Sequence, residues 1–420
     1  MNQAGAPADI AIVGAGAAGL ATAIFARRAN PDRSVLLLDG ARTPGAKILV
    51  SGGSRCNVTN RVVSDTDFWG GRRSLIKRVL RAFTADDTVR FFRDLNVPLH
   101  EEADGKLFPD TNKARDVLNA LLRAADEAGV RLRANHRVVG LAAVDGGFQL
   151  ATAHGDLRCR RVVLATGGQS LPRSGSDGLG FTFAAALGHT IVPTTPALAP
   201  LVLEESSDAI HRTLAGVSHD VELSVWVDGR IATRLRGSLL WTHFGISGPV
   251  ALNASRHWLR AVIEKRKSTM TANFCPAETF ETLEQRWMET ASTRPRSSIV
   301  SAVAAMVPAS AAAALLERLG IDASSPLAHM TRNDRRALIR ALVEWPLRVK
   351  DSRGYSFAEA TAGGVTLDEV DMATMESRVC RGLFLVGEVL DVDGRIGGFN
   401  FQWAWSTGYV AGRALGGRSA

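Results

Sequence analysis

Short apolar runs and glycine-rich turns alternate at the start of the chain. Residues 9–13 (DIAIV) form a short apolar run, which predicts a buried strand. Residues 20–29 (LATAIFARRA) have the pattern of a helix, and residues 34–39 (SVLLLD) form a second apolar run. These segments predict a βαβ unit of roughly 30 residues, the building block of a parallel sheet.

The pattern then changes several times. Residues 40–60 are rich in glycine and predict a loop, and residues 72–95 predict helical structure. Residues 114–128 carry apolar side chains at the three- and four-residue spacing of an amphipathic helix. Alternation from residue 131 onward predicts a short β-meander that ends in the apolar strand 161–166 (RVVLAT).

Domain boundaries are indicated by changes in composition. The proline-rich segment 193–201 (PTTPALAPL) precedes β-like alternation over 200–250 and an Ala- and Arg-rich helical stretch over 277–345. After about residue 352 the glycine-rich strand-turn-helix pattern returns. We therefore expect one discontinuous α/β domain, residues 1–189 and 352–420, interrupted by a β-rich unit at 190–275 and a helical unit at 276–351.

Composition and charge narrow the class of protein. The 420 residues are 46% hydrophobic, enough for a large core, and the net charge of +8 favours an anionic partner such as a phosphorylated cofactor, an acidic substrate or RNA. The four cysteines are widely spaced without a CxxC pair, so we expect no metal site and no disulfide framework. We find no signal-peptide pattern and no long apolar span, and expect a cytoplasmic protein without a membrane partner.

A GxGxxG motif lies between the first strand and the first helix. Gly14 permits a tight turn, Gly16 lets the backbone approach a pyrophosphate, and Gly19 lets the helix pack closely on the strand. Ala18 lies within the motif, and Asp39 ends the second strand 20 residues after Gly19, where an acid can accept hydrogen bonds from ribose hydroxyls. The sequence therefore predicts a Rossmann-type dinucleotide site.

Two further segments favour FAD over NAD. Residues 161–172 (RVVLATGGQSLP) are similar to the second dinucleotide-contact motif of flavoproteins with two dinucleotide-binding domains. Residues 382–394 are similar to their late motif, and the glycines that follow lead into a helix whose start can face the pyrimidine edge of a flavin. No second GxGxxG occurs in its own βαβ unit, so NAD(P)H would visit only transiently, or another reductant or oxygen would serve.

The chain resembles the BaiN/RdsA family of FAD-dependent oxidoreductases, also called aminoacetone-oxidase-like flavoproteins. The resemblance is carried in order by segments 45–60 (GAKILVSGGSRCNVTN), 104–122, 165–201, 242–252 (THFGISGPVAL), 361–378 and 382–412. It implies a discontinuous FAD domain with inserted β-rich and helical units. The chain departs from the family pattern at Ser54, where a third glycine is favoured, and at Arg395 and Phe399.

The segment SGGSRCNVTN raises a separate question about catalysis. Gly52 and Gly53 would let the backbone approach a flavin, Arg55 could neutralise phosphate, and Asn57 could donate to the ring. Cys56 is either a proton donor with a low pKa or a small packing residue. His243 is either an acid or substrate donor, or a turn histidine.

The candidate residues are divided into two sets. The candidate catalytic residues are Cys56 and His243. The predicted contacts of a non-covalently bound FAD are Gly14, Gly16, Ala18, Gly19, Asp39, Lys47, Gly52, Gly53, Arg55, Asn57, Val138, Thr166, Gly167, Gly168, Gly387, Glu388, Asp393, Gly397, Gly398 and Asn400.

Three functions remain open at this stage. The first is an FAD-dependent oxidoreductase that passes hydride to or from a small organic substrate, for which the resemblance implies reduction of an activated C=C bond, with NAD(P)H as donor, or amine oxidation. The second is reduction of a uridine of ribosomal RNA to dihydrouridine, which the basic charge favours. The third is a flavin-binding protein without catalysis.

Overall fold

The computed structural model describes residues 8–205 and 209–417, which divide into two compact units. The first unit comprises residues up to Thr194 together with those from Ala360 onward, and the second comprises Thr195–Glu359. The chain leaves the first unit within β11 (Ile191–Ala197) and returns to it at β19 (Ala360–Val365). From the sequence we expected this region to divide into a β-rich unit and a helical unit. The second unit has one continuous hydrophobic core, and that division stays a prediction.

A parallel sheet lies at the centre of the first unit. Its five parallel strands have the order β22-β10-β1-β2-β7, so the chain visits them in the order of a Rossmann fold. Apolar, buried residues fill β1, β2, β22 and the end of β10, as expected for parallel strands with both faces covered, whereas the edge strand β7 is exposed. Their bounds are β1 (Ala8–Val13), β2 (Val35–Leu38), β7 (Arg131–Arg133), β10 (Gly155–Leu164) and β22 (Leu383–Leu385).

Smaller β elements extend the first unit. The predicted meander is formed by β8 (Val138–Val144), β9 (Gly147–Thr152) and β10. Strand β9 pairs antiparallel with both β8 and β10. The outer strands β20 (Val370–Asp371) and β21 (Glu376–Ser377) continue the sheet beyond β22. Two separate small sheets join β3 (Thr59–Asn60), β5 (Leu99–Glu102) and β6 (Lys106–Pro109), and β4 (Phe68–Gly70) and β23 (Val392–Gly394).

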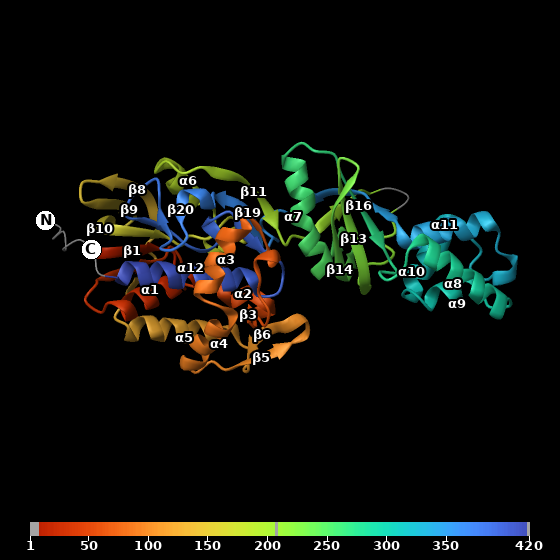
Figure 1. Cartoon of the computed structure of the whole chain (residues 1–420), viewed down its shortest axis with the longest axis horizontal. Coiled ribbons are helices and arrows are strands. Elements are labelled where there is room, and N and C mark those ends of the chain that lie inside the picture. The colour runs from red at the N-terminus through yellow and green to blue at the C-terminus, as the bar shows by residue number, and fades with distance from the viewer. Residues whose placement is uncertain (1–7, 206–208, 418–420) are drawn as a thin grey trace. The chain divides into compact units, whose positions relative to one another are not determined.

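Helices from both ends of the chain pack against each other in the first unit. Figure 1 shows α1 (Ala17–Ala29) and α12 (Phe399–Gly416) side by side, although one follows the first strand and the other ends the described chain. The remaining helices of this unit are α2 (Ala46–Ser54), α3 (Arg73–Ala82), α4 (Ala85–Asp94), α5 (Ala114–Glu127) and α6 (Leu179–Ala186).

Two helical features differ from the sequence-based expectation. Residues 46–54 form α2, where we expected only a loop, because the helical part precedes the two glycines that dominate the composition. The single helical stretch expected over 72–95 is two helices. Thr84 breaks it, because its side chain caps α4 by accepting a hydrogen bond from the amide of Asp87.

The second unit combines an antiparallel sheet with helices. The strand order is β17-β16-β13-β14-β15-β12-β18, and α7 (Pro249–Ile263) packs on this sheet within a stretch that we had expected to be β-rich. The strands are β12 (Leu201–Leu203), β13 (Ser218–Val227), β14 (Arg230–Thr242), β15 (Gly245–Ser247), β16 (Ser268–Asn273), β17 (Trp345–Leu347) and β18 (Val349–Ser352). The other helices are α8 (Phe280–Thr293), α9 (Ile299–Ala304), α10 (Ala309–Leu319) and α11 (Arg332–Val343).

The apolar stretch over residues 299–316 is divided between α9 and α10. Across residues 8–205 and 209–417, no helix combines the length and the apolar character that a membrane span requires.

Candidate cofactor-binding site

The turn between β1 and α1 has the geometry of an anion site. Gly14 has a φ of +105°, and a Cβ at this position would lie 2.4 Å from the carbonyl oxygen of Ala165. A Cβ at Gly19 would lie 1.9 Å from the carbonyl oxygen of Gly14, so only glycine allows this close helix–strand packing. A Cβ at Gly16, the N-cap of α1, would meet nothing within 4 Å. The helix start therefore has open space and no capping side chain, as a pyrophosphate requires.

Asp39 holds this turn against the end of β2. Its carboxylate accepts hydrogen bonds from the amides of Ala15 and Ala41, each at 2.8 Å. Burial raises the Asp39 pKa and outweighs these two donors, which lower it. The amide of His136 donates to the Asp39 carbonyl at 2.7 Å, and the buried Val138 follows at the start of β8. Because a carboxylate oxygen has a second lone pair, Asp39 can still accept from a ribose.

The turn before α12 is a second uncapped helix start. Gly397 and Gly398 have φ angles of +122° and +93°, and a Cβ at Gly398 would lie 2.5 Å from the backbone of Thr59. With its side-chain oxygen toward Gly398, Asn57 accepts from the Gly398 amide at 3.1 Å and donates to the Thr59 carbonyl at 2.8 Å. Asn60 donates to the Gly397 carbonyl at 3.1 Å. Asn57 therefore positions this turn with its side-chain amide, the group that we had expected to donate to the flavin ring.

Asn400 holds the preceding residues in a similar way. Its side chain accepts from the Gly394 amide at 2.8 Å and donates to the Gly394 carbonyl at 3.0 Å. Gly394 ends β23, the strand that contains the buried Asp393 and pairs with β4. Both predicted contacts thus lie at the approach to α12.

The packing of α1 on α12 sets the spacing of the two helix starts. A Cβ at Gly408 would lie 2.8 Å from Ala21 Cβ, and one at Gly416 would lie 2.5 Å from Ala29 Cβ, so the helices run parallel in close contact. Gly408 lies nine residues into α12, whereas its neighbours Ala18 and Ala21 lie one and four residues into α1. At 1.5 Å per residue, α12 begins roughly 10 Å beyond the start of α1.

An ion pair joins α2 to the loop that follows β22. Lys47 Nζ lies 2.5 Å from Glu388 Oε2 and donates to Ser170 Oγ at 2.7 Å. Ser170 Oγ and the amide of Thr361 donate to Glu388 Oε1, each at 2.8 Å. Burial alone would raise the Glu388 pKa, but the charge of Lys47 and these hydrogen bonds outweigh it and lower the pKa.

The predicted glycines after β10 and β22 surround this ion pair. A Cβ at Gly168 would lie 2.4 Å from Thr361 Oγ1 and 3.0 Å from Glu388 Oε1, and one at Gly387 would lie 2.9 Å from Ala18 Cβ. The neighbouring Gly167 has a φ of +72°, and the side chain of Thr166 packs against α6. The residues after these two strands therefore meet at the start of α1.

The sequence did not identify the residues that hydrogen-bond to the Lys47–Glu388 pair. Ser170 and Thr361 lie within segments that carry the family resemblance, but a serine or threonine in such a segment has no pattern that reveals its partner.

The turn at the end of α2 contains four residues in the left-handed region. Gly52, Gly53, Ser54 and Cys56 have φ angles of +54°, +68°, +67° and +63°. This conformation explains why the family pattern favours a glycine where Ser54 stands, since a side chain there is strained. Gly52 and Gly53 are exposed, and a Cβ at Gly53 would meet nothing within 4 Å, so a ligand can approach the backbone at this point.

Cys56 does not have the low pKa that we expected beside Arg55. The side chain is 0% exposed and packs in the main core, and burial raises its pKa to about 12, although a hydrogen bond with Ser51 acts in the opposite direction. The thiol is therefore protonated and shielded at neutral pH. A catalytic role for Cys56 stays a prediction that this environment does not favour.

Arg55 is engaged by protein groups. Its guanidinium lies 4.1 Å from the centre of the Phe108 ring and donates to Glu102 Oε1 at 2.6 Å. A carboxylate thus supplies the negative charge that we had expected from a phosphate.

His243, the other candidate catalytic residue, belongs to the second unit. It is exposed in the turn between β14 and β15, and its ring packs edge-on against Phe244 at 5.2 Å between centroids. Its role as an acid or substrate donor stays a prediction.

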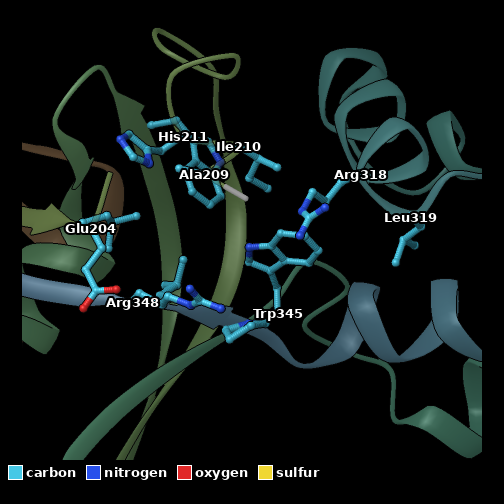
Figure 2. Close-up of a pocket in the computed structure, with 12 residues that line it drawn as sticks. Glu204, Ala209, Ile210, His211, Arg318, Leu319, Trp345 and Arg348 are labelled. Carbon is cyan, nitrogen blue, oxygen red and sulfur yellow. The ribbon is translucent and has the colours of Figure 1, made fainter. Parts of the chain in front are cut away.

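The second unit also contains a pocket of about 240 Å³. Figure 2 shows Trp345, Arg318 and Arg348 among the side chains that line it, and none of the predicted site residues contributes to it. Within the described parts of the chain, no group of three or more His, Cys, Asp or Glu side chains could hold a metal ion.

Comparison with known proteins agrees with the observed fold. The family model described as "HI0933-like protein Rossmann domain" matches residues 8–414. The Mycobacterium smegmatis Sdh1 complex in the apo form is similar in fold, with a TM-score of 0.50 and 15% identity over 97% of this chain and 68% of that chain. The predicted fold class, a Rossmann-type α/β domain of the flavoprotein kind, is confirmed.

Two curated relatives match over nearly their whole length. The ribosomal RNA dihydrouridine synthase of Escherichia coli K12 is 33% identical over 97% of this chain and 98% of its own. The 3-dehydro-bile acid delta(4,6)-reductase of Clostridium scindens is 32% identical over 96% of this chain and 98% of its own. The family expected from the sequence is confirmed, and the chain belongs to the HI0933-like family of FAD-dependent oxidoreductases.

Proposed function

We propose that this protein reduces a C=C bond conjugated to a carbonyl group. The observation that carries the proposal is the chemistry shared by two relatives of nearly equal identity. Dihydrouridine forms when the ring double bond beside a uracil carbonyl is reduced, and a delta(4,6)-reductase of a 3-dehydro-bile acid acts on double bonds conjugated to a ketone. The relatives differ in substrate size, but both bonds accept hydride for the same electronic reason.

The residues of the first unit fit FAD. The start of α1 would bind the pyrophosphate, Asp39 and Val138 would contact the adenosine end, and the exposed backbone at Gly53 would border the flavin. The start of α12, roughly 10 Å further on, would place its positive end near the pyrimidine carbonyls. When bound, FAD supplies hydride transfer, and the chain positions the cofactor and biases its charge.

We propose NAD(P)H as the electron donor. The parts of the chain that the structure describes contain one Rossmann unit, and the elements that would bind FAD belong to it. NAD(P)H would therefore bind transiently and leave before the substrate enters. Anaerobic mixing of the FAD-loaded protein with NADH or NADPH should bleach the flavin absorbance near 450 nm, and a flavin reduced only by dithionite would exclude both donors.

The reaction class is tested by reoxidation of the reduced protein without oxygen. A 3-oxo-Δ4 steroid and 2-cyclohexenone should restore the oxidised flavin spectrum, whereas cyclohexene and cyclohexanone should not, because each lacks half of the conjugated system. Reoxidation by a primary amine's imine product, with none by the enones, would instead favour amine chemistry.

Ribosomal RNA is the second candidate substrate. The net charge of +8 favours a polyanionic partner, and one relative is named for this activity. The test is the dihydrouridine content of ribosomal RNA in a strain that lacks the gene, measured by mass mapping. An unchanged content would exclude RNA and leave the small-molecule substrate.

A further inference from the structure

Helix α3 of the first unit has an apolar face and a strongly basic face. The side chains of Ile76, Val79 and Leu80 are buried in the main core. The rest of the helix carries four exposed cations and no carboxylate, and these cations are Arg73, Lys77, Arg78 and Arg81. Because the large apolar side chains are turned toward the core, the exposed surface of α3 is dominated by positive charge. We call these four residues the basic face of α3.

Three residues of the basic face form a row. Arg73, Lys77 and Arg81 are each four positions apart, so they lie on successive turns of the same side of the helix. The rise between neighbours in the row is roughly 6 Å, and Arg78 lies one position after Lys77, toward the side of the row. A row of this kind matches a partner whose own charges repeat along a chain better than it matches a single small anion.

Most of this charge is not neutralised within the protein. Lys77 Nζ lies 4.0 Å from Asp65 Oδ1, the limit of an ion pair. Among residues 8–205 and 209–417, no carboxylate forms an ion pair with the guanidinium groups of Arg73, Arg78 and Arg81. Like charges four residues apart on a helix repel each other. An anionic partner would remove that repulsion, so the face is suited to one.

We propose that the basic face of α3 binds the phosphate backbone of RNA. The choice of RNA rests on the second candidate function, since one relative is named for a ribosomal RNA activity. A phosphate backbone presents a row of negative charges, and lysine and arginine side chains that contact it release condensed counterions. An anionic membrane is a poorer match, because helices that lie on membranes insert their apolar side chains, and those of α3 are buried in protein.

The position of α3 connects this surface to the cofactor site. Figure 1 shows α3 beside α12, and the two helices are in contact. Both belong to the first unit, whose residues fit FAD. RNA bound to α3 would therefore be held by the same unit that would hold the flavin.

The decisive variant combines Arg73→Gln with Arg81→Gln, because glutamine removes the charge and keeps a high helix propensity. The matched control combines Arg115→Gln with Arg123→Gln in α5, which are also exposed, eight positions apart and in the first unit. Both double variants lower the net charge of +8 by the same two charges. Flavin content and thermal midpoint should equal those of the wild type in each, because all four side chains are exposed.

The readout is the Kd of the FAD-loaded full chain for a fluorescent oligouridine of about 20 nucleotides, measured over a range of salt concentrations. Each lost contact lowers the slope of log Kd against log salt by about 0.7, so the α3 variant should lose about 1.4 in slope and bind about 25-fold more weakly at 0.1 M salt. The α5 control should keep the wild-type slope and bind less than about threefold more weakly, because salt screens distant charges. Arg73→Lys with Arg81→Lys should restore the wild-type slope, since this effect depends on charge.

The outcomes separate this inference from the proposed function. Equal slopes in the α3 variant and the α5 control would overturn the role of α3. A wild-type protein that binds phosphatidylglycerol vesicles but not the oligouridine would overturn RNA as the partner. Binding that depends on α3, together with an unchanged dihydrouridine content in the strain that lacks the gene, would support this surface and refute ribosomal RNA as the substrate.

Discussion

The ion pair between Lys47 and Glu388 should stabilise the first unit far more than an exposed pair of similar geometry. The perturbation is Glu388→Gln, which removes the charge but keeps an oxygen for the Ser170 hydroxyl and the Thr361 amide. Lys47 then retains its positive charge without the carboxylate 2.5 Å away. The comparison variant is Asp368→Asn, which breaks the pair of Arg72 and Asp368 at 2.6 Å.

Solvent exposure sets the expected magnitudes. The side chains of Lys47 and Glu388 are 24% and 19% exposed, whereas those of Arg72 and Asp368 are 69% and 59% exposed. Removing one partner of a fully buried pair costs about 3–5 kcal/mol, and the remaining exposure of Lys47 reduces the expected loss to about 2–3 kcal/mol. Water screens the exposed pair, so Asp368→Asn should cost less than about 1 kcal/mol.

The assay is urea unfolding of the FAD-free full chain at pH 7, followed by tryptophan fluorescence. Adding Lys47→Met to Glu388→Gln should recover part of the loss, because no uncompensated charge then remains. Equal losses in Glu388→Gln and Asp368→Asn would refute the reasoning, since they would show that burial does not strengthen this pair.

The same pair should affect stability in acid. The Glu388 pKa is lowered in the folded protein, so the folded state resists protonation of this group more than the unfolded state does. Its contribution is therefore complete above the unfolded pKa of about 4.3 and is lost as the pH falls through the folded pKa. The stability difference between the wild type and Glu388→Gln should shrink below about pH 4.3, and a difference that grows there would contradict this sign.

Three further predictions concern the turns around α1 and α2. Gly16→Ala should leave the stability of the apoprotein unchanged, since its Cβ meets only open space, but it should weaken FAD retention. Gly19→Ala should impair both stability and FAD retention, because its Cβ would clash with the Gly14 carbonyl. Equal urea midpoints for the two apoproteins would contradict this prediction. Cys56 should resist iodoacetamide in the native protein, and the stability that it contributes should fall above about pH 8.5, where only the unfolded thiol ionises; native labelling detected by mass spectrometry would disprove the burial. Ser54→Gly should raise the free energy of unfolding by about 1 kcal/mol by relieving its left-handed backbone, and a lower urea midpoint would exclude that strain.

Local rules made the Rossmann turn and the elements around it predictable from the sequence. The strands β1 and β2, the helix α1 and the acid Asp39 follow from apolar runs and from glycines whose spacing has a steric cause. In the same way, the positive φ at Ser54 explains why the family pattern favours a glycine at this position. Such features depend on neighbours a few residues away, and pattern reasoning can find them.

Partners distant in sequence were not accessible in the same way. Lys47 and Glu388 are separated by 341 positions, and neither residue's pattern indicates the other. Asn57 was assigned to the flavin because its type suits that role, but its amide contacts the backbone of Thr59 and Gly398. The helix α2 was missed because Gly52 and Gly53 dominate its composition, although the helical turns precede them.

The spacing of small residues along α12 had a structural meaning that composition did not reveal. Gly408, Gly412 and Gly416 recur every four residues and lie along one face, where each would clash with α1 if it carried a Cβ. Their contact with α1 fixes both the parallel direction and the offset of roughly 10 Å between the two helix starts. Two positive helix ends at a fixed separation favour an extended ligand with a phosphate at one point and electron-rich carbonyls at another. We therefore propose that α12 contributes to cofactor binding along its whole length, and a larger side chain at Gly412 should weaken FAD binding although Gly412 lies more than three turns from the start of α12.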